Sequence, residues 1–198
     1  MTQGKPDLGS AAVAATNGRM IRLFTALSLP PELAEPLARR QTGLPGARWR
    51  PTEALHVTLA FYGEVGERTA DDLAAELERA ATGGPFALSL SGVGAFGEGH
   101  RTHAVWAGVA PNERLNVLAG RCRAAGERAG LRLETRAYRP HVTLAYLKPQ
   151  TDPARIGAWI TGHNLLESPP ARIDRFGLYS SVLTRDGSHY ELEREYLL

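Results

Sequence analysis

The sequence predicts an α+β fold with two lobes. Each lobe is a β–α–β unit, a pseudo-twofold axis relates the two, and their sheets face a central cleft. First, strand-like and helix-like apolar patterns follow one another in the same order twice. Second, the tetrapeptide His-Val-Thr-Leu occurs once in each half. Third, no linker is long enough to separate the halves, so we predict one bilobal domain over residues 20–198.

The first half begins after a stretch without periodicity. Residues 1–19 are small and polar, and we predict a flexible tail there. Apolar alternation predicts a strand that Pro30-Pro31 ends, and acidic residues favour a helix directly afterwards. A Gly- and Pro-rich loop then leads to a second strand, a helix and a third strand. The predicted elements are strands Met20–Leu29, Leu55–Tyr62 and Phe86–Ser91, and helices Glu32–Thr42 and Glu67–Ala81.

The second half repeats this order and adds a hairpin. A strand stops at Pro111, a helix follows, Gly130 makes a turn, and Pro140 introduces the strand that carries the second tetrapeptide. Near the end, Asp186-Gly187 is typical of the tight turn of a β-hairpin. The predicted elements are strands Thr102–Val109, Leu131–Glu134 and His141–Leu147, helix Asn112–Ala129, and hairpin strands Arg172–Leu183 and Ser188–Leu197.

Composition excludes several classes of protein. With 23 basic and 21 acidic residues, the formal net charge of +2 is too small for a strongly basic nucleic-acid coat. No window approaches the roughly 18 apolar residues of a membrane span, and no secretory signal is recognisable, so we expect cytoplasmic residence. One cysteine excludes a disulfide scaffold and a cysteine-built metal site; Cys122 falls on the apolar face of its helix, where we expect a buried thiol.

The two copies of the tetrapeptide, His56–Leu59 and His141–Leu144, are the informative residues. Strand geometry puts histidine and threonine of each copy on one face, and valine and leucine on the packed side. A pseudo-twofold axis would bring both polar faces to one cleft. A single such copy is usually only a satisfied polar group, whereas two equivalently placed copies favour a catalytic site. The converging side chains would be His56, Thr58, His141 and Thr143.

Two imidazoles and two hydroxyls suit phosphoester chemistry without a metal or cofactor. One neutral imidazole can accept a proton from the attacking group, and the other, as imidazolium, can protonate the leaving oxygen. Unperturbed histidine titrates near pH 6.5, so both forms are accessible near neutrality. The hydroxyls can donate to the phosphate oxygens and stabilise developing charge.

These paired motifs resemble those of the 2H phosphoesterases, and the chain is most similar to their RNA 2′,3′-cyclic phosphodiesterase branch, also called 2′-5′ RNA ligase-like. The resemblance spans about residues 22–198. Besides the motifs, the matching segments are Arg22–Ala26, Arg48-Trp49, Gly92–Phe96, Val105–Val109, Arg139–His141 and Leu178–Ser180.

The resemblance implies a bilobal, LigT-like α+β fold with the active site between the lobes. By motif position, it implies that His56 is the proton donor to the leaving 3′ oxygen and that His141 is the acceptor that activates water. Thr58 and Thr143 would bind the phosphate oxygens. Family members often carry a basic residue five positions after the second histidine, but here Tyr146 takes that place and supplies no positive charge.

We therefore expect metal-independent opening of RNA 2′,3′-cyclic phosphate ends to 2′-phosphates, by a monomer that needs no cofactor. The partner would be an RNA or oligonucleotide with such an end, and no membrane would be involved. Three alternatives stay open: joining of RNA ends through 2′-5′ linkages, action on a small cyclic nucleotide such as ADP-ribose cyclic phosphate, and binding of RNA ends without turnover.

Other motifs have simpler explanations. Gly92–Gly97 matches the glycine pattern of dinucleotide-binding proteins, but no helix is predicted to begin at its third glycine, so we expect a loop beside the cleft. His100 and His103 lack a third metal ligand at recognisable spacing. For His163 and His189 we expect surface positions in a loop and beside the hairpin turn.

A run of arginines in the second half has two interpretations. A solvated helix face is slightly favoured, and a track for the RNA backbone is the alternative. In the latter case, Trp49, Tyr62 or Tyr138 would offer a stacking surface for a terminal base. The arginines are Arg121, Arg123, Arg128, Arg132, Arg136 and Arg139.

Overall fold

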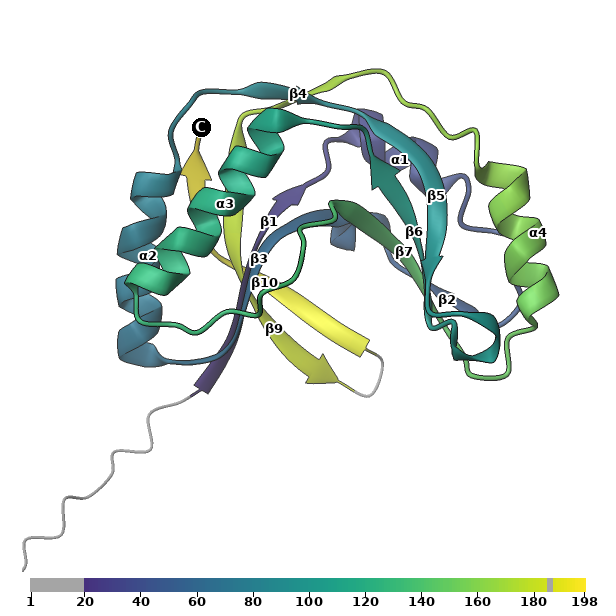
Figure 1. Ribbon diagram of the computed structural model, residues 1–198, viewed down its shortest axis with the longest axis horizontal. Coiled ribbons are helices and arrows are strands. Elements are labelled where there is room, and N and C mark those ends of the chain that lie inside the picture. Colours follow the sequence, from purple (N-terminus) through teal and green to yellow (C-terminus); the bar gives the residue numbers. More distant parts are fainter. Residues whose placement is uncertain (1–19, 185–186) are drawn as a thin grey trace, which may run out of the picture.

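A computed structural model describes residues 20–184 and 187–198, and the predicted tail at residues 1–19 lies outside the described residues. Figure 1 shows helices on the outer sides of a strongly curved sheet. The helices are α1 (Pro31–Ala38), α2 (Glu67–Ala80), α3 (Glu113–Arg128) and α4 (Pro153–His163). The strands are β1 (Met20–Ser28), β2 (Ala47–Trp49), β3 (His56–Gly66), β4 (Phe86–Leu88), β5 (Leu90–Phe96), β6 (Ala104–Val109), β7 (His141–Leu147), β8 (Ala171–Ile173), β9 (Arg175–Thr184) and β10 (Gly187–Leu197).

The two halves join in one antiparallel sheet. Its strand order is β10-β9-β1-β3-β7-β6-β5, and β2 also pairs with β7. The order β9-β1-β3 on one side matches β5-β6-β7 on the other, so the pseudo-twofold axis passes between β3 and β7. The pairing register shifts at equivalent places, between Thr25 and Ala26 in β1 and between Val105 and Trp106 in β6. These features confirm the predicted fold class.

The helices cover the outer side of the sheet, opposite the polar faces of the motifs. α3 follows β6 in the second half but packs on the first half, against α2 and β3, whereas α4 contacts β5. Local sequence explains where the helices begin. The side chain of Asn112 accepts a hydrogen bond from the Leu115 N–H at the start of α3, and Asp152 does the same for the Ala154 N–H at the start of α4.

Several predicted boundaries were wrong. Leu131–Glu134 is not a strand: the Arg123 guanidinium occupies the Leu133 and Glu134 carbonyls instead of a neighbouring strand. α1 ends at Ala38, earlier than predicted, and the turns after it place the Thr42 carbonyl where the Trp159 indole N–H donates to it.

One strand and one α-helix had no prediction at all, β2 and α4. The hairpin was predicted correctly as β9 and β10, but the predicted strand Arg172–Leu183 is divided at Asp174: residues before it belong to β8, which pairs with β4. Residues 185–186 lie outside the described residues. Within the part of the chain that the structure describes, no helix has the length and apolar character needed to cross a membrane.

Candidate active site

The two tetrapeptides lie side by side at the pseudo-twofold axis. β3 pairs with β7 through Val57 and Val142, the second residue of each copy. Both valines are fully buried, and they lie on the packed side of the sheet as predicted. Because the strands are antiparallel, one residue along each strand places His56 beside Thr143, and Thr58 beside His141. All four polar side chains therefore share the opposite face of the sheet, and each is partly exposed.

Each histidine is held by the same local hydrogen bond. The Nδ1 atom of His56 lies 2.8 Å from the Ala54 carbonyl oxygen, and that of His141 lies 2.7 Å from the Arg139 carbonyl oxygen. A carbonyl oxygen only accepts, so Nδ1 carries the hydrogen in both rings. Nε2 of each ring is then left to accept a proton when the ring is neutral or to donate one when it is charged.

An aromatic wall from the first half and the hairpin surrounds His56. Its ring lies 5.3 Å from that of Phe24 and 5.2 Å, edge to face, from that of Tyr190. The hydroxyl groups of Tyr179 and Ser28 are 2.7 Å apart in the same wall. A pocket of about 280 Å³ opens beside His56, lined by these residues together with Arg50, Pro51, Glu53, Ala54, Ser188 and His189.

A different pair of rings flanks His141. The Phe96 ring lies 4.7 Å away, edge to face, and the Trp106 ring 6.4 Å away. Trp106 packs flat on Gly94, where a Cβ atom would overlap the indole. We predicted a loop for the Gly92–Gly97 segment, and that prediction was wrong, because residues through Phe96 form β5. The third glycine of the segment, with φ +91°, follows β5 and leads into a single 3₁₀ turn, Gly99–Arg101, and not into an α-helix, in keeping with the rejection of dinucleotide binding.

The surroundings of His56 favour its neutral form in the free protein. Burial lowers the pKa of His56 below its ordinary value, and the positive charges of Arg50 and His141 lower it further. The hydrogen bond to the Ala54 carbonyl acts in the opposite direction. The pairing of Val57 with Val142, the residues that follow the two histidines, places both imidazoles on either side of one point of the sheet.

Tyr146 lies on the same face as the catalytic candidates, and two arginine side chains pack against its ring. The Arg48 guanidinium lies 5.8 Å from its ring and the Arg50 guanidinium 6.0 Å. Burial raises the pKa of the Tyr146 hydroxyl, and the nearby Tyr190 hydroxyl raises it further. Arg50 and Tyr190 are site residues that sequence reasoning missed, although Arg50 belongs to the basic pair that precedes the first motif.

The remaining histidines are not part of the motif pair, although His189 lines the pocket beside His56. His163 is not in a loop: it is the last residue of α4, and its ring stacks 4.5 Å from that of Trp159. His103 stacks on Phe96, and His100 and His189 are exposed. Among the described residues, no group of three or more His, Cys, Asp or Glu side chains could hold a metal ion.

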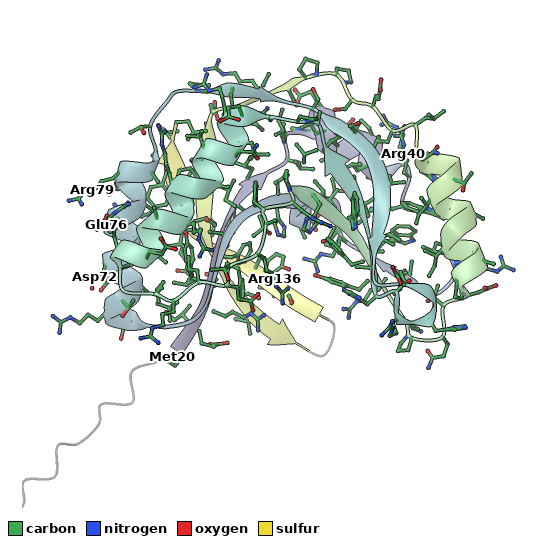
Figure 2. All side chains as sticks on the ribbon, viewed as in Figure 1. Met20, Arg40, Asp72, Glu76, Arg79 and Arg136 are labelled. Carbon is green, nitrogen blue, oxygen red and sulfur yellow. The ribbon has the colours of Figure 1, made fainter. Side chains whose placement is uncertain are left out.

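Contacts within the chain explain much of the arginine run. Arg121, Arg123 and Arg128 bind oxygen atoms of Thr82, Glu134 and Glu76, respectively. These contacts favour the solvated helix face. In Figure 2, Asp72 and Arg79 lie at the outer edge of α2, whereas Arg136 lies near the middle of the view, at the coil that leads to β7.

Of the three predicted stacking surfaces, Tyr62 is unavailable. It is 6% exposed, and its hydroxyl donates to the Cys122 carbonyl. Cys122 is fully buried, as predicted, and burial raises the pKa of its thiol to about 12. Tyr138 is 36% exposed, and its hydroxyl donates to the Thr58 carbonyl. That bond ties the coil before the second motif to the first.

Several known proteins with a similar sequence share one name. A chain from Thermotoga maritima named RNA 2′,3′-cyclic phosphodiesterase is 32% identical over 164 residues, 81% of this chain and 83% of that one. A chain of the same name from Escherichia coli is 36% identical over 127 residues, 62% of this chain and 70% of that one.

Solved structures share the fold. The TT0787 protein of Thermus thermophilus superimposes with a TM-score of 0.75 at 27% identity, covering 89% of this chain and 97% of that one. LigT of Escherichia coli, complexed with 3′-AMP, superimposes with a TM-score of 0.73 at 27% identity, covering 91% and 99%. The family model described as the 2′-5′ RNA ligase superfamily matches residues 29–185, most of the described chain. The protein belongs to the 2′-5′ RNA ligase superfamily of 2H phosphoesterases.

Proposed function

We propose that this protein hydrolyses the 2′,3′-cyclic phosphate ends of RNA to 2′-phosphates, with His56 as proton donor and His141 as proton acceptor. The observation that carries the proposal is the Val57–Val142 pairing, which gathers two histidines and two threonines on one face. The relatives named RNA 2′,3′-cyclic phosphodiesterase, up to 36% identical, support this choice of substrate.

The arrangement suits in-line displacement at phosphorus. His56 and His141 lie on opposite sides of the Val57–Val142 pair, so a phosphate bound above that pair lies between the two imidazoles. Within residues 20–184 and 187–198, the hydroxyl groups of Thr58 and Thr143 have no hydrogen-bond partner. They are free to donate to the non-bridging oxygens on which charge develops.

Each proton has a defined origin and destination. Nε2 of neutral His141 accepts a proton from water while the water oxygen bonds to phosphorus. The bond between phosphorus and O3′ breaks, and Nε2 of charged His56 gives its proton to O3′. The products are a 2′-phosphate and a 3′-hydroxyl. Proton exchange with solvent then returns both rings to their starting forms.

The pKa of His56 is lowered in the free protein, but binding of the anionic substrate should raise it and so allow His56 to act as the acid. The cyclic phosphate is an anion, and an anion beside an imidazole favours its charged form. Binding of substrate therefore opposes the effects of burial and of Arg50 and draws a proton onto His56. The same reasoning predicts that phosphate binding is accompanied by proton uptake.

The proposal extends to the protein's organisation in solution. Both halves of the site come from one chain, so a monomer of one bilobal domain, residues 20–198, suffices. RNA or oligonucleotide ends would be the partners, and the cytoplasm would be the place of action.

The direct test is incubation, in EDTA, of the protein with an oligonucleotide that ends in a 2′,3′-cyclic phosphate. We expect the mass of one water to be gained, and we expect regiochemical analysis of the end to find the phosphate on O2′. His56→Ala and His141→Ala should each lower the rate by about 10²- to 10⁴-fold. The exposed His100 provides the matched control, because His100→Ala should leave the rate unchanged.

The outcomes separate the proposal from its alternatives. Joined products in the presence of a 5′-hydroxyl acceptor, with no hydrolysis, would favour ligation. Tight binding of the oligonucleotide without turnover by the wild type would favour a binding protein. Turnover of a small cyclic nucleotide alone would exclude RNA ends as the substrate.

A further inference from the structure

Arg50 lies at the point where the two motif strands, β3 and β7, separate. β3 pairs with β7 only through Val57 and Val142, and β2 takes the neighbouring place along β7, from Ala145 to Leu147. Directly after β2, the Arg50 N–H donates to the Leu144 carbonyl at 2.8 Å. The Arg50 backbone is thus bonded to the residue that follows Thr143, while its side chain lines the pocket of His56.

The Arg50 side chain is held between two aromatic rings. Its guanidinium lies 4.9 Å from the centroid of Tyr190 and 6.0 Å from that of Tyr146. The residue is only 9% exposed. Among the residues that the structure describes, no carboxylate forms an ion pair with it.

A buried guanidinium without a counter-ion is expected to bind an anion. Removing a charge from water without a counter-ion is costly, and the two aromatic faces offset only part of that cost. A phosphate in the adjoining pocket would offset the rest, because the planar guanidinium matches two phosphate oxygens with two parallel N–H groups. Arg50 and His56 line the same pocket, so an anion bound there by Arg50 would lie beside the proton donor.

We propose that Arg50 binds the non-bridging oxygens of the substrate phosphate and supplies the positive charge that Tyr146 does not. This inference rests on the proposed function, since it assigns a residue to the same site. Tyr146 and Tyr190 act as positioning residues that hold the guanidinium toward the pocket.

The test compares Arg50→Met and Arg50→Lys with the wild type, after circular dichroism and thermal melting have established that each is folded. We expect Arg50→Met to lower kcat/KM for a cyclic phosphate end by about 100-fold. Its affinity for inorganic phosphate, measured by calorimetry, should fall about 30-fold. Arg50→Lys should recover part of both losses. Removing the charge should also move the His56-dependent limb of the pH profile to higher pH, an effect that a packing role would not produce.

Arg48→Met is the matched control. It removes a guanidinium that packs on the same Tyr146 ring but does not line the pocket, so both measurements should change less than about threefold. The inference is overturned if folded Arg50→Met retains wild-type phosphate affinity, or if Arg48→Met loses as much affinity as Arg50→Met does. If the wild type binds phosphate but opens no cyclic phosphate, the proposed function fails, and the calorimetric comparison still decides the role of Arg50.

Discussion

His56 and His141 occupy equivalent places in the two halves but have different neighbours. Each begins its strand, and each donates through Nδ1 to the carbonyl two residues earlier. Around His56 lie Phe24, Tyr190 and the charge of Arg50, whereas Phe96 and Trp106 flank His141. The comparison teaches that the duplicated strands set the positions of the two imidazoles. Neighbours outside the repeated tetrapeptide, on β1, β5, β6 and the hairpin, make them chemically unequal.

The prediction with the largest expected effect tests whether the different surroundings make His56 the proton donor and His141 the proton acceptor. A phosphodiester whose leaving group is p-nitrophenolate needs little protonation to depart. On this substrate, His56→Ala should lose less than about tenfold in kcat/KM, whereas His141→Ala should keep its full loss of about 10²- to 10⁴-fold. Steady-state release of p-nitrophenolate measures both.

A His56→Ala, His141→Ala double variant is the check on that experiment. It should resemble His141→Ala on the activated substrate, because the acid is no longer needed. The reverse pattern, with His141→Ala spared, would exchange the two roles.

The aromatic side chains around His56 should contribute more to stability than those around His141. Phe24 is 4% exposed and contacts the rings of His56, Tyr179 and Tyr190. Phe24→Ala should lower the free energy of unfolding by about 3–4 kcal/mol. Phe96 is only partly buried, and Phe96→Ala should cost about 1–2 kcal/mol. Urea denaturation measures both, and equal losses would mean that the two walls are equally well packed.

Local patterns predicted the parts of the molecule that repeat. The two tetrapeptides, the prolines before the helices and the hairpin turn are all short-range signals, and they placed His56, Thr58, His141 and Thr143 correctly on one face. α4 also had such a signal, because Asp152-Pro153 is a favourable helix start and Ile156 and Trp159 follow at helical spacing. That element was detectable and was missed.

The missing parts of the site depend on long-range pairing. Tyr190 reaches His56 only because β10 pairs with β9 and β9 with β1. Arg50 reaches the site only because β3 leaves β7 and β2 takes its place. A strand also needs a partner, which explains why the apolar alternation at Leu131–Glu134 was misleading: the Arg123 side chain binds those carbonyls. No local pattern contains this information.

A smaller effect tests how the coil before β7 is anchored. In the first half, backbone pairing of β2 with β7 fixes the chain, whereas in the second half a side chain makes a comparable contact, from the Tyr138 hydroxyl to the Thr58 carbonyl at 3.0 Å. Tyr138→Phe removes only that hydroxyl and should lower the free energy of unfolding by about 1 kcal/mol. Equilibrium denaturation gives the value. No change in stability would mean that water replaces the hydroxyl, and that the coil is anchored elsewhere.

The pH dependence of stability should carry a contribution from His56. Its pKa is lowered in the folded protein, chiefly by burial, so the unfolded chain binds the proton more readily than the folded one does. The stability that neutral His56 contributes is complete above its unfolded pKa, near 6.5, and is lost as pH falls through the lower folded value. Urea midpoints between pH 8 and pH 5 should therefore decline more steeply in the wild type than in His56→Asn. Saturating phosphate should flatten the decline, because the anion favours the imidazolium that burial opposes. If His56→Asn declines as steeply as the wild type, burial does not lower the pKa of His56 in the folded protein.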